Sequence, residues 1–384
     1  MNFELTSEQI TIKNMVRDFA AAEVMPHVVE YDRLERFPIE IVKKMADLGL
    51  MGGTIPVTYG GAGLDNQTLV IAVEEMSRVC QIMGLCMSLA SGLVGSSILR
   101  YGTEEQKLKY LRPLARGEIF AAAGITESHS GTDVAAMSTT AARTVKGYVL
   151  RGSKAWISFL DVADWVLTFA TLDKTKGAKG ICAFIVERGT PGMSWRPFKN
   201  KLGFRPLVTG EVFFDDCLVP FSSLVGKEGE GLRVALCAVE NGRMTVAARA
   251  LGLAQACLDS SIKYAKERIV FQKAIGRFQL VQSMITDMIL GIEAARLLTY
   301  RLAWLKDHGQ ERARLASSLA KMHAADVALM AATHAVQIHG AYGVSEESGV
   351  ARYFRDAKVF QIVEGQNQLH RALIAELALG FRDA

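Results

Sequence analysis

The sequence predicts an α+β protein in which a helical part, a β-rich part and a second helical part follow one another. Helix-capping signatures and helical apolar spacing lie before residue 118, whereas short β-rich runs fill roughly 120–225. All eight prolines lie within the first 220 of the 384 residues. The remainder suits long helices, because a proline inside a helix costs about 3 kcal/mol. We expect three domains, at 1–118, 119–226 and 227–384.

The first part opens with Thr6 and Gln9 in the spacing of a capping box, and apolar residues then recur at helical intervals. Thr103 and Gln106 repeat this signature. Between them, residues 70–100 are apolar, rich in Met, Leu and Ala, and contain no proline. Residues 1 to about 118 are therefore predicted to be mostly helical.

The middle part has a different residue pattern from the helical first part. Its strand-like runs are separated by Gly, Asp and Pro, and they lie at 148–150, 165–169, 181–186 and 211–214. They indicate a β-domain. The proline-free tail is predicted to hold four helices, at roughly 229–267, 277–307, 311–339 and 356–378, which would pack as a four-helix bundle.

The composition is that of an ordinary globular chain. Half of the residues are apolar, and 44 basic and 40 acidic residues give a net charge of +4 without a polybasic arm or an acidic tail. Nucleic acid and membrane surfaces are therefore not predicted as partners. The start of the chain lacks the features of a signal peptide and no apolar run could cross a bilayer, so a cytoplasmic location is expected.

Several apparent signals do not support a function. The six cysteines form no CxxC pair, so we interpret them as reduced packing residues. The glycine clusters at 60–63 and 226–231 lack the strand and helix that a dinucleotide-binding loop requires, and we interpret them as tight turns. The histidines form no HExxH motif, and no GxSxG elbow occurs. Neither a metal nor a serine nucleophile is predicted.

A set of separated motifs carries a family resemblance. In the β-rich part these are AGITE at 123–127, GTD at 131–133, GSKAWIS at 152–158, KLG at 201–203 and DCLVP at 216–220. In the C-terminal part they are RIVF at 268–271, QIHGAYG at 337–343, RDAK at 355–358 and VEG at 363–365. In this order and spacing, over essentially the whole chain, they resemble the acyl-CoA dehydrogenases.

This resemblance implies a flavoprotein with an N-terminal helical domain, a middle β-domain and a C-terminal four-helix bundle, assembled as a homotetramer that is a dimer of dimers. It also implies FAD as cofactor, an acyl-CoA thioester as substrate and electron-transferring flavoprotein as electron acceptor. The implied reaction is α,β-dehydrogenation of the acyl group to a trans-2-enoyl-CoA.

That reaction explains a carboxylate in the motif VEG. The α-proton of a thioester is weakly acidic, so its removal needs a carboxylate at the α-carbon and donors for the carbonyl oxygen. The resemblance implies that Glu364 is this base and that its backbone N–H helps to bind the oxygen, while a hydride leaves for flavin N5. Gly365 suits a tight turn beside a ligand. In some family branches the base stands at the position of Gly242, which here has no side chain.

The local sequence alone favours another interpretation of Glu364. A carboxylate in a helical bundle is often a salt-bridge partner, and Arg371 lies within reach in the sequence. Only the complete set of motifs shifts the balance towards catalysis.

The resemblance also implies contacts with FAD and with the substrate. Thr132, Glu240, Arg243 and Gly365 would contact the substrate, with Arg243 and Glu240 at the 3′-phosphate and adenine end of CoA. The residues implied to line the flavin or otherwise bind FAD are Ile125, Thr126, Thr132, Trp156, Ile157, Ser158, Gln366 and Gln368. Arg268, Phe271 and Gln279 would reach the adenine-diphosphate half of the FAD that is bound in a neighbouring subunit. Gln337 and Gly340 would approach this same half of FAD from the other chain.

The chain departs from the family pattern at four places. Ser-His-Ser replaces Pro-Gly-Ala at 128–130, Phe-Leu replaces Asn-Gly at 159–160, and Gln272 and Gln366 replace a glycine and a threonine. Because His129 does not adopt a positive φ as cheaply as glycine, the path of its loop stays open. Two other functions also stay open: oxidation of an acyl or aminoacyl group tethered to a carrier protein, and a scaffold without activity.

Overall fold

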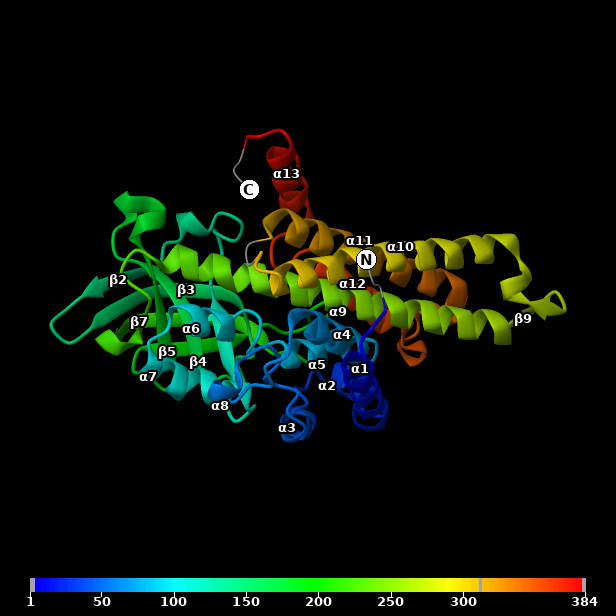
Figure 1. Ribbon diagram of the computed structural model, residues 1–384, viewed down its shortest axis with the longest axis horizontal. Coiled ribbons are helices and arrows are strands. Elements are labelled where there is room, and N and C mark those ends of the chain that lie inside the picture. The colour runs from blue at the N-terminus through cyan, green and yellow to red at the C-terminus, as the bar shows by residue number, and fades with distance from the viewer. Residues whose placement is uncertain (1–3, 311–312, 382–384) are drawn as a thin grey trace.

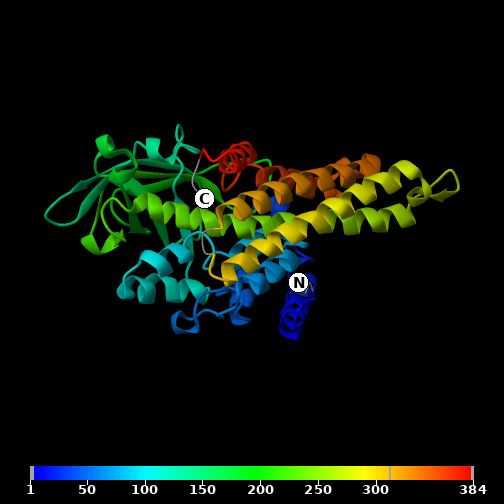
Figure 2. The same cartoon turned by 45° about the horizontal axis from the view of Figure 1, so that its top comes forward.

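The computed structural model describes residues 4–310 and 313–381. The molecule is elongated, with a sheet at one end and long helices that run from it to the other end (Figure 1). The N-terminal helices lie along one side of these long helices, as the tilted view in Figure 2 also shows. The predicted α+β class and the order of its three parts are confirmed.

The N-terminal part is helical, and both predicted capping boxes are present. The hydroxyl of Thr6 accepts a hydrogen bond from the Gln9 N–H, and that of Thr103 accepts one from the Gln106 N–H, each at 3.2 Å. The helices are α1 (Ser7–Phe19), α2 (Val28–Leu34), α3 (Ile39–Asp47), α4 (Asn66–Ser77), α5 (Gln81–Met87), α6 (Gly95–Tyr101), α7 (Glu104–Gln106) and α8 (Arg112–Ala115).

In the described part of the chain, the middle strands form one eight-stranded sheet in the order β6-β7-β3-β2-β4-β5-β8, with β1 paired to β4. All four predicted strand runs fall within it. Strands β4 and β5 are almost entirely buried, which agrees with their continuous apolar sequences. The strands are β1 (Ala121–Gly124), β2 (Thr140–Arg143), β3 (Tyr148–Ser158), β4 (Trp165–Thr171), β5 (Ile181–Glu187), β6 (Met193–Pro197), β7 (Thr209–Val219) and β8 (Leu224–Val225).

Three of the four helices predicted for the tail are present: α9 (Gly231–Glu267), α10 (Gln279–Asp307) and α11 (Arg314–His339). A short hairpin of β9 (Ile269–Val270) and β10 (Lys273–Ala274) joins α9 to α10. In Figure 1 this hairpin forms the tip of the molecule opposite the sheet.

The prediction of a single fourth helix over 356–378 is wrong. The chain instead forms α12 (Val350–Phe360) and α13 (Asn367–Ala378), separated by a turn at 361–366. Glu364 and Gly365 have φ angles of +56° and +91°, whereas a right-handed helix needs about −63°. These two successive residues with positive φ separate the helices without a proline, so the absence of proline gave a false indication of continuity.

The three parts share one buried junction. The guanidinium of Arg249 in α9 lies over the rings of Phe204 from the middle part and Phe360 from α12, at 5.4 Å from each. Its Nη2 donates to the side-chain oxygen of Gln81 in α5 at 3.2 Å. Asp356 of α12 accepts a hydrogen bond from the N–H of Phe204 at 2.7 Å. The position of α12, and of the turn that follows it, is therefore fixed from all three parts.

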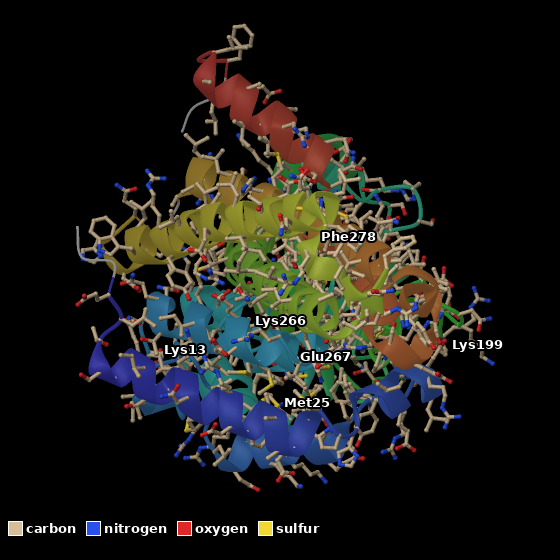
Figure 3. The ribbon with its side chains drawn as sticks, turned by 90° about the vertical axis from the view of Figure 1, so that its right-hand side faces the viewer. Lys13, Met25, Lys199, Lys266, Glu267 and Phe278 are labelled. Atoms are coloured by element: carbon tan, nitrogen blue, oxygen red, sulfur yellow. The ribbon has the colours of Figure 1, made fainter. Side chains whose placement is uncertain are left out.

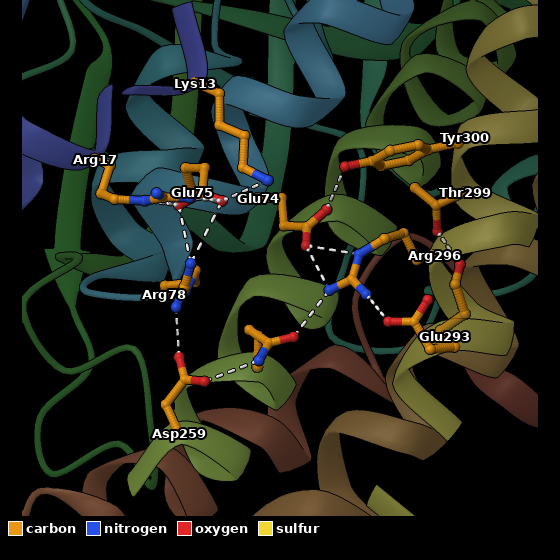
Figure 4. Close-up of polar contacts among 12 residues, drawn as sticks. Lys13, Arg17, Glu74, Glu75, Arg78, Asp259, Glu293, Arg296, Thr299 and Tyr300 are labelled. Atoms are coloured by element: carbon orange, nitrogen blue, oxygen red, sulfur yellow. Dashed lines mark hydrogen bonds and ion pairs between the residues drawn. The ribbon is translucent and has the colours of Figure 1, made fainter. Parts of the chain in front are cut away.

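Two buried carboxylates connect α4 to helices α1 and α10 (Figure 4). Glu75 accepts hydrogen bonds from Nε and Nη2 of Arg17 in α1, both at 3.1 Å. Glu74 accepts hydrogen bonds at 2.9 Å from Arg296 and Tyr300 in α10. Buried charges persist only when partners satisfy them, and these are paired. We therefore assign this cluster a structural role.

The cysteines and the two glycine clusters have the structural roles that the sequence indicated. All six cysteines are buried and free, as packing residues should be. Gly60 and Gly63, and likewise Gly226 and Gly229, have positive φ angles and form turns. Among the described residues, none of the helices is long and apolar enough to cross a membrane, and no group of three or more His, Cys, Asp or Glu side chains could hold a metal ion.

Candidate functional site

The turn between α12 and α13 presents Glu364 in a backbone conformation that only glycine adopts freely. The left-handed conformation costs a non-glycine residue about 1–2 kcal/mol, and such costs are concentrated at functional sites. Two basic side chains and a histidine hold the carbonyl groups of this turn. Arg243 Nε donates to Glu364 O at 3.1 Å, His370 Nε2 lies 3.3 Å from the same oxygen, and Lys321 Nζ donates to Gly365 O at 2.7 Å.

The carboxyl group of Glu364 is an unusually weak acid. Loss of water around the carboxylate raises its pKa to about 7, against the opposing effect of the nearby Arg243, Lys321 and Arg249 cations. Burial likewise lowers the pKa of Lys321 to about 7 and that of His370 to about 3. At neutral pH, Glu364 can therefore both take up and release a proton, as a general base must.

Glu364 does not form the salt bridge with Arg371 that the local sequence favours. Arg371 Nη2 instead pairs with Asp326 Oδ2 of α11 at 2.8 Å. Within the described part of the chain, the Glu364 carboxylate makes no direct hydrogen bond or ion pair. It is therefore available to a ligand.

Gly242 in α9 provides the space in which this carboxylate lies. A Cβ atom at position 242 would be 2.8 Å from Glu364 Cδ and 2.9 Å from both carboxylate oxygens. Contacts this short are not tolerated, so any side chain at 242 would displace the carboxylate. The sequence showed only that Gly242 cannot itself be a base, whereas the structure shows that it also makes room for one.

Trp156 lies at a bulge of β3 and is not a core residue. The register of β3 against β7 shifts between Lys154 and Ile157, and Trp156 has a φ of +61°. Bulges re-aim side chains, and here the indole is 64% exposed and lies 4.7 Å from the Phe198 ring. Its neighbour Ile157 is buried in the core.

The loop after β1 lies beside the same strand. The carbonyl oxygen of Thr126 accepts a hydrogen bond from the Ala155 N–H at 2.8 Å, which places Ile125 and Thr126 next to the Trp156 segment. Both are partly buried, whereas Thr132 is exposed. The structure thus gathers the implied flavin-lining residues of the middle part around one end of β3.

A loop of the middle part connects this cluster with the turn at Glu364. Ser158 Oγ lies 3.4 Å from Thr209 Oγ1, at the start of β7. The loop before Thr209 carries Phe204, whose ring packs on Phe360 of α12 at a centroid distance of 5.3 Å. Phe360 precedes Glu364 by four residues. The two groups therefore belong to one continuous packed unit.

The departure at 128–130 leaves the loop without strain. None of these three residues has a positive φ, and Glu127 and Ser130 exchange two backbone hydrogen bonds. Beneath them lies a buried pair that sequence reasoning missed: Lys154 Nζ donates to Glu127 Oε1 at 2.7 Å. Burial would raise the pKa of Glu127, but hydrogen bonds from Lys154, Ser138 and Thr139 lower it to about 2. The available signal was Lys154, a charged residue in the middle of the β-rich segment 148–158.

The second group of implied FAD residues lies at the far end of the molecule. Figure 3 looks onto this end, where Lys266, Glu267 and Phe278 are labelled around the α9–α10 hairpin. Arg268, Phe271 and Gln279 belong to this hairpin and its flanks, and all three are exposed. His339 stacks on Tyr264 of α9 at 4.3 Å, which brings the end of α11, and with it Gln337 and Gly340, to the same end.

Within one chain, the implied flavin-lining residues at β3 and the implied FAD residues at hairpin β9–β10 are not brought together. Strand β3, which carries Trp156, and the hairpin β9–β10 lie at opposite ends of the long axis (Figure 1). A ligand that touches both groups would have to contact two chains.

The implied substrate residues have separate partners. Glu240 pairs with Arg314 Nε at 3.5 Å, while Arg243 is hydrogen-bonded to the turn. A Cβ at Gly365 would lie 3.1 Å from His370 Nε2 and 3.4 Å from Arg243 Nη2, so the turn is tightly enclosed. Gln366 and Gln368, at the start of α13, are exposed.

Comparison with known proteins identifies the class. Family models described as "Acyl-CoA dehydrogenase, N-terminal domain", "Acyl-CoA dehydrogenase, middle domain" and "Acyl-CoA dehydrogenase, C-terminal domain" match residues 6–118, 122–217 and 229–379. Together with the observed fold they define a flavoprotein oxidoreductase. The chain belongs to the acyl-CoA dehydrogenase family, and it has the complete three-part architecture of an acyl-CoA dehydrogenase.

Individual relatives are similar over their full length. A short-chain specific acyl-CoA dehydrogenase of Clostridium acetobutylicum is 44% identical over 375 residues, which cover 98% of this chain and 99% of the relative. Butyryl-CoA dehydrogenase from Megasphaera elsdenii superposes with a TM-score of 0.95 at 38% identity, covering 99% of this chain and 100% of that one. A chain from a structure described as "Electron transferring flavoprotein of Acidaminococcus fermentans: Towards a mechanism of flavin-based electron bifurcation" has a TM-score of 0.96 at 42% identity and covers 100% of both chains.

Proposed function

We propose that this chain dehydrogenates a short-chain acyl-CoA to its trans-2-enoyl-CoA, with Glu364 as the base that removes the α-proton. The observation that carries the proposal is the carboxylate of Glu364, which lies against Gly242 without a direct polar partner among the described residues, and whose pKa burial raises to about 7. A base with this pKa is matched to neutral pH. The short chain length is supported by the short-chain specific relative and by the likeness to a butyryl-CoA dehydrogenase.

The chain's own groups would bind the thioester carbonyl. Within the described residues, the N–H of Glu364 donates to no backbone oxygen. Arg243 and His370 contact the carbonyl oxygen of Glu364 and Lys321 donates to that of Gly365, so the two peptides that follow this N–H are held in place. A preorganised donor of this kind stabilises the negative charge that develops on the thioester oxygen. We propose that Arg243 acts on the substrate through this turn, with Thr132, Glu240 and Gly365 as direct substrate contacts.

The residues fit FAD as the cofactor. Exposed Trp156 beside the Ser158 and Thr209 hydroxyls suits a planar ring with polar edges, whereas Arg268 and exposed Phe271 suit a pyrophosphate and an adenine. When bound, FAD would accept the β-hydride at N5. We propose as its ligands Ile125, Thr126, Thr132, Trp156, Ile157, Ser158, Gln366 and Gln368, together with Arg268, Phe271, Gln279, Gln337 and Gly340 of a neighbouring subunit.

We further propose that the chain assembles as a homotetramer built from dimers and that it passes electrons to an electron-transferring flavoprotein. The separation of the two FAD groups supports the assembly, because a complete site would then need two chains. The likeness to a chain in the structure of the Acidaminococcus electron transferring flavoprotein supports the electron acceptor.

An anaerobic titration tests the reaction and the substrate together. We expect the FAD-loaded protein to lose its flavin absorbance on addition of butyryl-CoA, and to respond less to octanoyl-, palmitoyl- and branched acyl-CoA. Titration with butyryl groups loaded on an acyl carrier protein is the matched comparison. Bleaching by the carrier-bound group alone would move the assignment to a tethered substrate, and a protein that binds FAD but is bleached by none of them would be a scaffold.

The raised pKa of Glu364 predicts the pH dependence. The base works only when ionised, so the rate of flavin bleaching should fall as the pH decreases through about 7, rather than through 4.5, the ordinary value for glutamate. Stopped-flow rates at subsaturating butyryl-CoA between pH 5 and 9 would show this acid limb. A rate that stays constant down to pH 5 would contradict the environment described for the carboxylate.

A further inference from the structure

Helix α11 reaches the turn at Glu364 through a lysine that sequence reasoning missed. We propose that Lys321 is a positioning residue for the catalytic base: it fixes the backbone of the turn and places a positive charge near the Glu364 carboxylate. This inference rests on the proposed role of Glu364 as the base. Lys321 lies among small and apolar residues of α11 and is fully buried.

The contacts of Lys321 are to the turn itself. Its Nζ donates to Gly365 O at 2.7 Å and to Asn367 Oδ1 at 3.0 Å, on either side of residue 366. A buried ammonium group is strongly destabilising unless its hydrogen bonds are satisfied. Movement of Gly365 O or Asn367 Oδ1 away from Lys321 would therefore be unfavourable, and both acceptors are held in position. Lys321 thereby ties the end of the turn to the start of α13.

Two further contacts from α11 enclose the turn. Asp326 Oδ1 accepts hydrogen bonds from Gln361 Nε2 and Asn367 Nδ2, both at 2.7 Å, and Met322 O accepts one from Asn367 Nδ2 at 3.1 Å. Gln361 begins the turn and Asn367 follows it, so hydrogen bonds to α11 hold the turn at both of its ends. Glu364, in its left-handed conformation, lies between these two hydrogen-bonded residues. Among these contacts from α11, that of Lys321 lies nearest to Glu364 in the sequence, because its acceptor is the carbonyl of the next residue, Gly365.

The charge of Lys321 acts on the same carboxylate. Glu364 is faced by Arg243 and Arg249 from α9, by Lys321 from α11 and by the uncharged His370 from α13. Lys321 in turn is faced by Glu364, Arg243 and Asp326. Each cation favours the ionised carboxylate, which burial disfavours, so loss of Lys321 should make Glu364 harder to ionise. Because the charge of each group affects the ionisation of the other, the pKa values of Lys321 and Glu364 are linked.

Replacement by a neutral chain of similar length tests this role. In Lys321→Met, we expect the midpoint for ionisation of Glu364 to rise by about one pH unit, as is usual for removal of a nearby opposite charge. The carboxylate band in infrared spectra, identified by difference from Glu364→Gln, gives this midpoint without substrate. We also expect flavin bleaching by butyryl-CoA to slow by about 10–100-fold with a smaller change in acyl-CoA affinity, because the misplaced base acts after binding.

Two variants separate positioning from general stability. Lys321→Arg keeps the cation, so its ionisation midpoint should stay near that of the parent. Lys201→Met removes a partly buried lysine of the middle part that also donates to backbone carbonyls, those of Arg205 and Leu207. This variant should leave the midpoint unchanged. If Lys321→Met, or Lys321→Gln where the methionine variant does not fold, titrates like the parent, the proposal is wrong. If no acyl-CoA bleached the flavin of the parent protein, the proposed function would be wrong. The infrared titration would still test the role of Lys321, because it needs no substrate.

Discussion

Replacement of Glu364 by glutamine is expected to slow flavin bleaching by butyryl-CoA by about 10²–10⁴-fold, the usual contribution of a general base. The amide has nearly the same size, and the native carboxylate has no direct partner among the described residues, so the variant should fold and retain FAD. Stopped-flow absorbance under anaerobic conditions measures the rate, and the flavin content of the purified protein confirms loading.

Proton removal can also be observed separately. Incorporation of deuterium at the α-carbon of butyryl-CoA in D₂O should be lost in Glu364→Gln. Glu364→Asp keeps a carboxylate one methylene further back and should show an intermediate rate. If the glutamine variant bleached as fast as the parent, the base would have to be another residue.

Gly242→Ala is expected to be nearly as harmful, although it changes no polar group. The new methyl group would lie 2.8–2.9 Å from the Glu364 carboxylate and would displace it. A displacement of about 1 Å at a reacting group costs about 10²-fold in rate. Alanine is favoured over glycine inside a helix by up to about 1 kcal/mol, so the helix itself should not be weakened. We therefore expect a folded, FAD-loaded protein with about 10²-fold slower flavin bleaching.

Gly291→Ala is the matched control. It makes the same change inside the neighbouring helix α10, where the new methyl group would meet the flexible end of Met330 at 3.0 Å and Val327 at 3.3 Å. Its flavin bleaching should equal that of the parent. Equal rates for the two alanine variants would mean that contact with Gly242 does not define the position of the base.

The features that the sequence predicted well depend on neighbouring residues. A capping box spans four residues, and the capping boxes at Thr6 and Thr103 formed as expected. The strands of the middle part were marked by continuous β-rich runs, and α9, α10 and α11 by the absence of proline. The family motifs indicated which residues to expect at the candidate site, although they did not show how these residues are held.

The features that were missed depend on distant residues. The break before α13 is stabilised by Arg243, which is 121 positions from Glu364 in the sequence. The bulge that exposes Trp156 arises from the pairing of β3 with β7. Lys321 looks like an ordinary helical lysine until the turn is seen against it. The cations that act on the Glu364 carboxylate come from α9 and α11, so its local sequence cannot distinguish it from a salt-bridge partner.

Strand β3, which carries Trp156, and hairpin β9–β10, which directly follows Arg268, lie at opposite ends of the molecule's long axis, and this separation has a genetic consequence. Under the proposed assembly, each site combines Glu364 and Trp156 of one subunit with Arg268 of another. A dimer formed from one Glu364→Gln chain and one Arg268→Ala chain would contain one site with both defects and one with neither. Two inactive alleles of the same gene could therefore complement each other within a single cell.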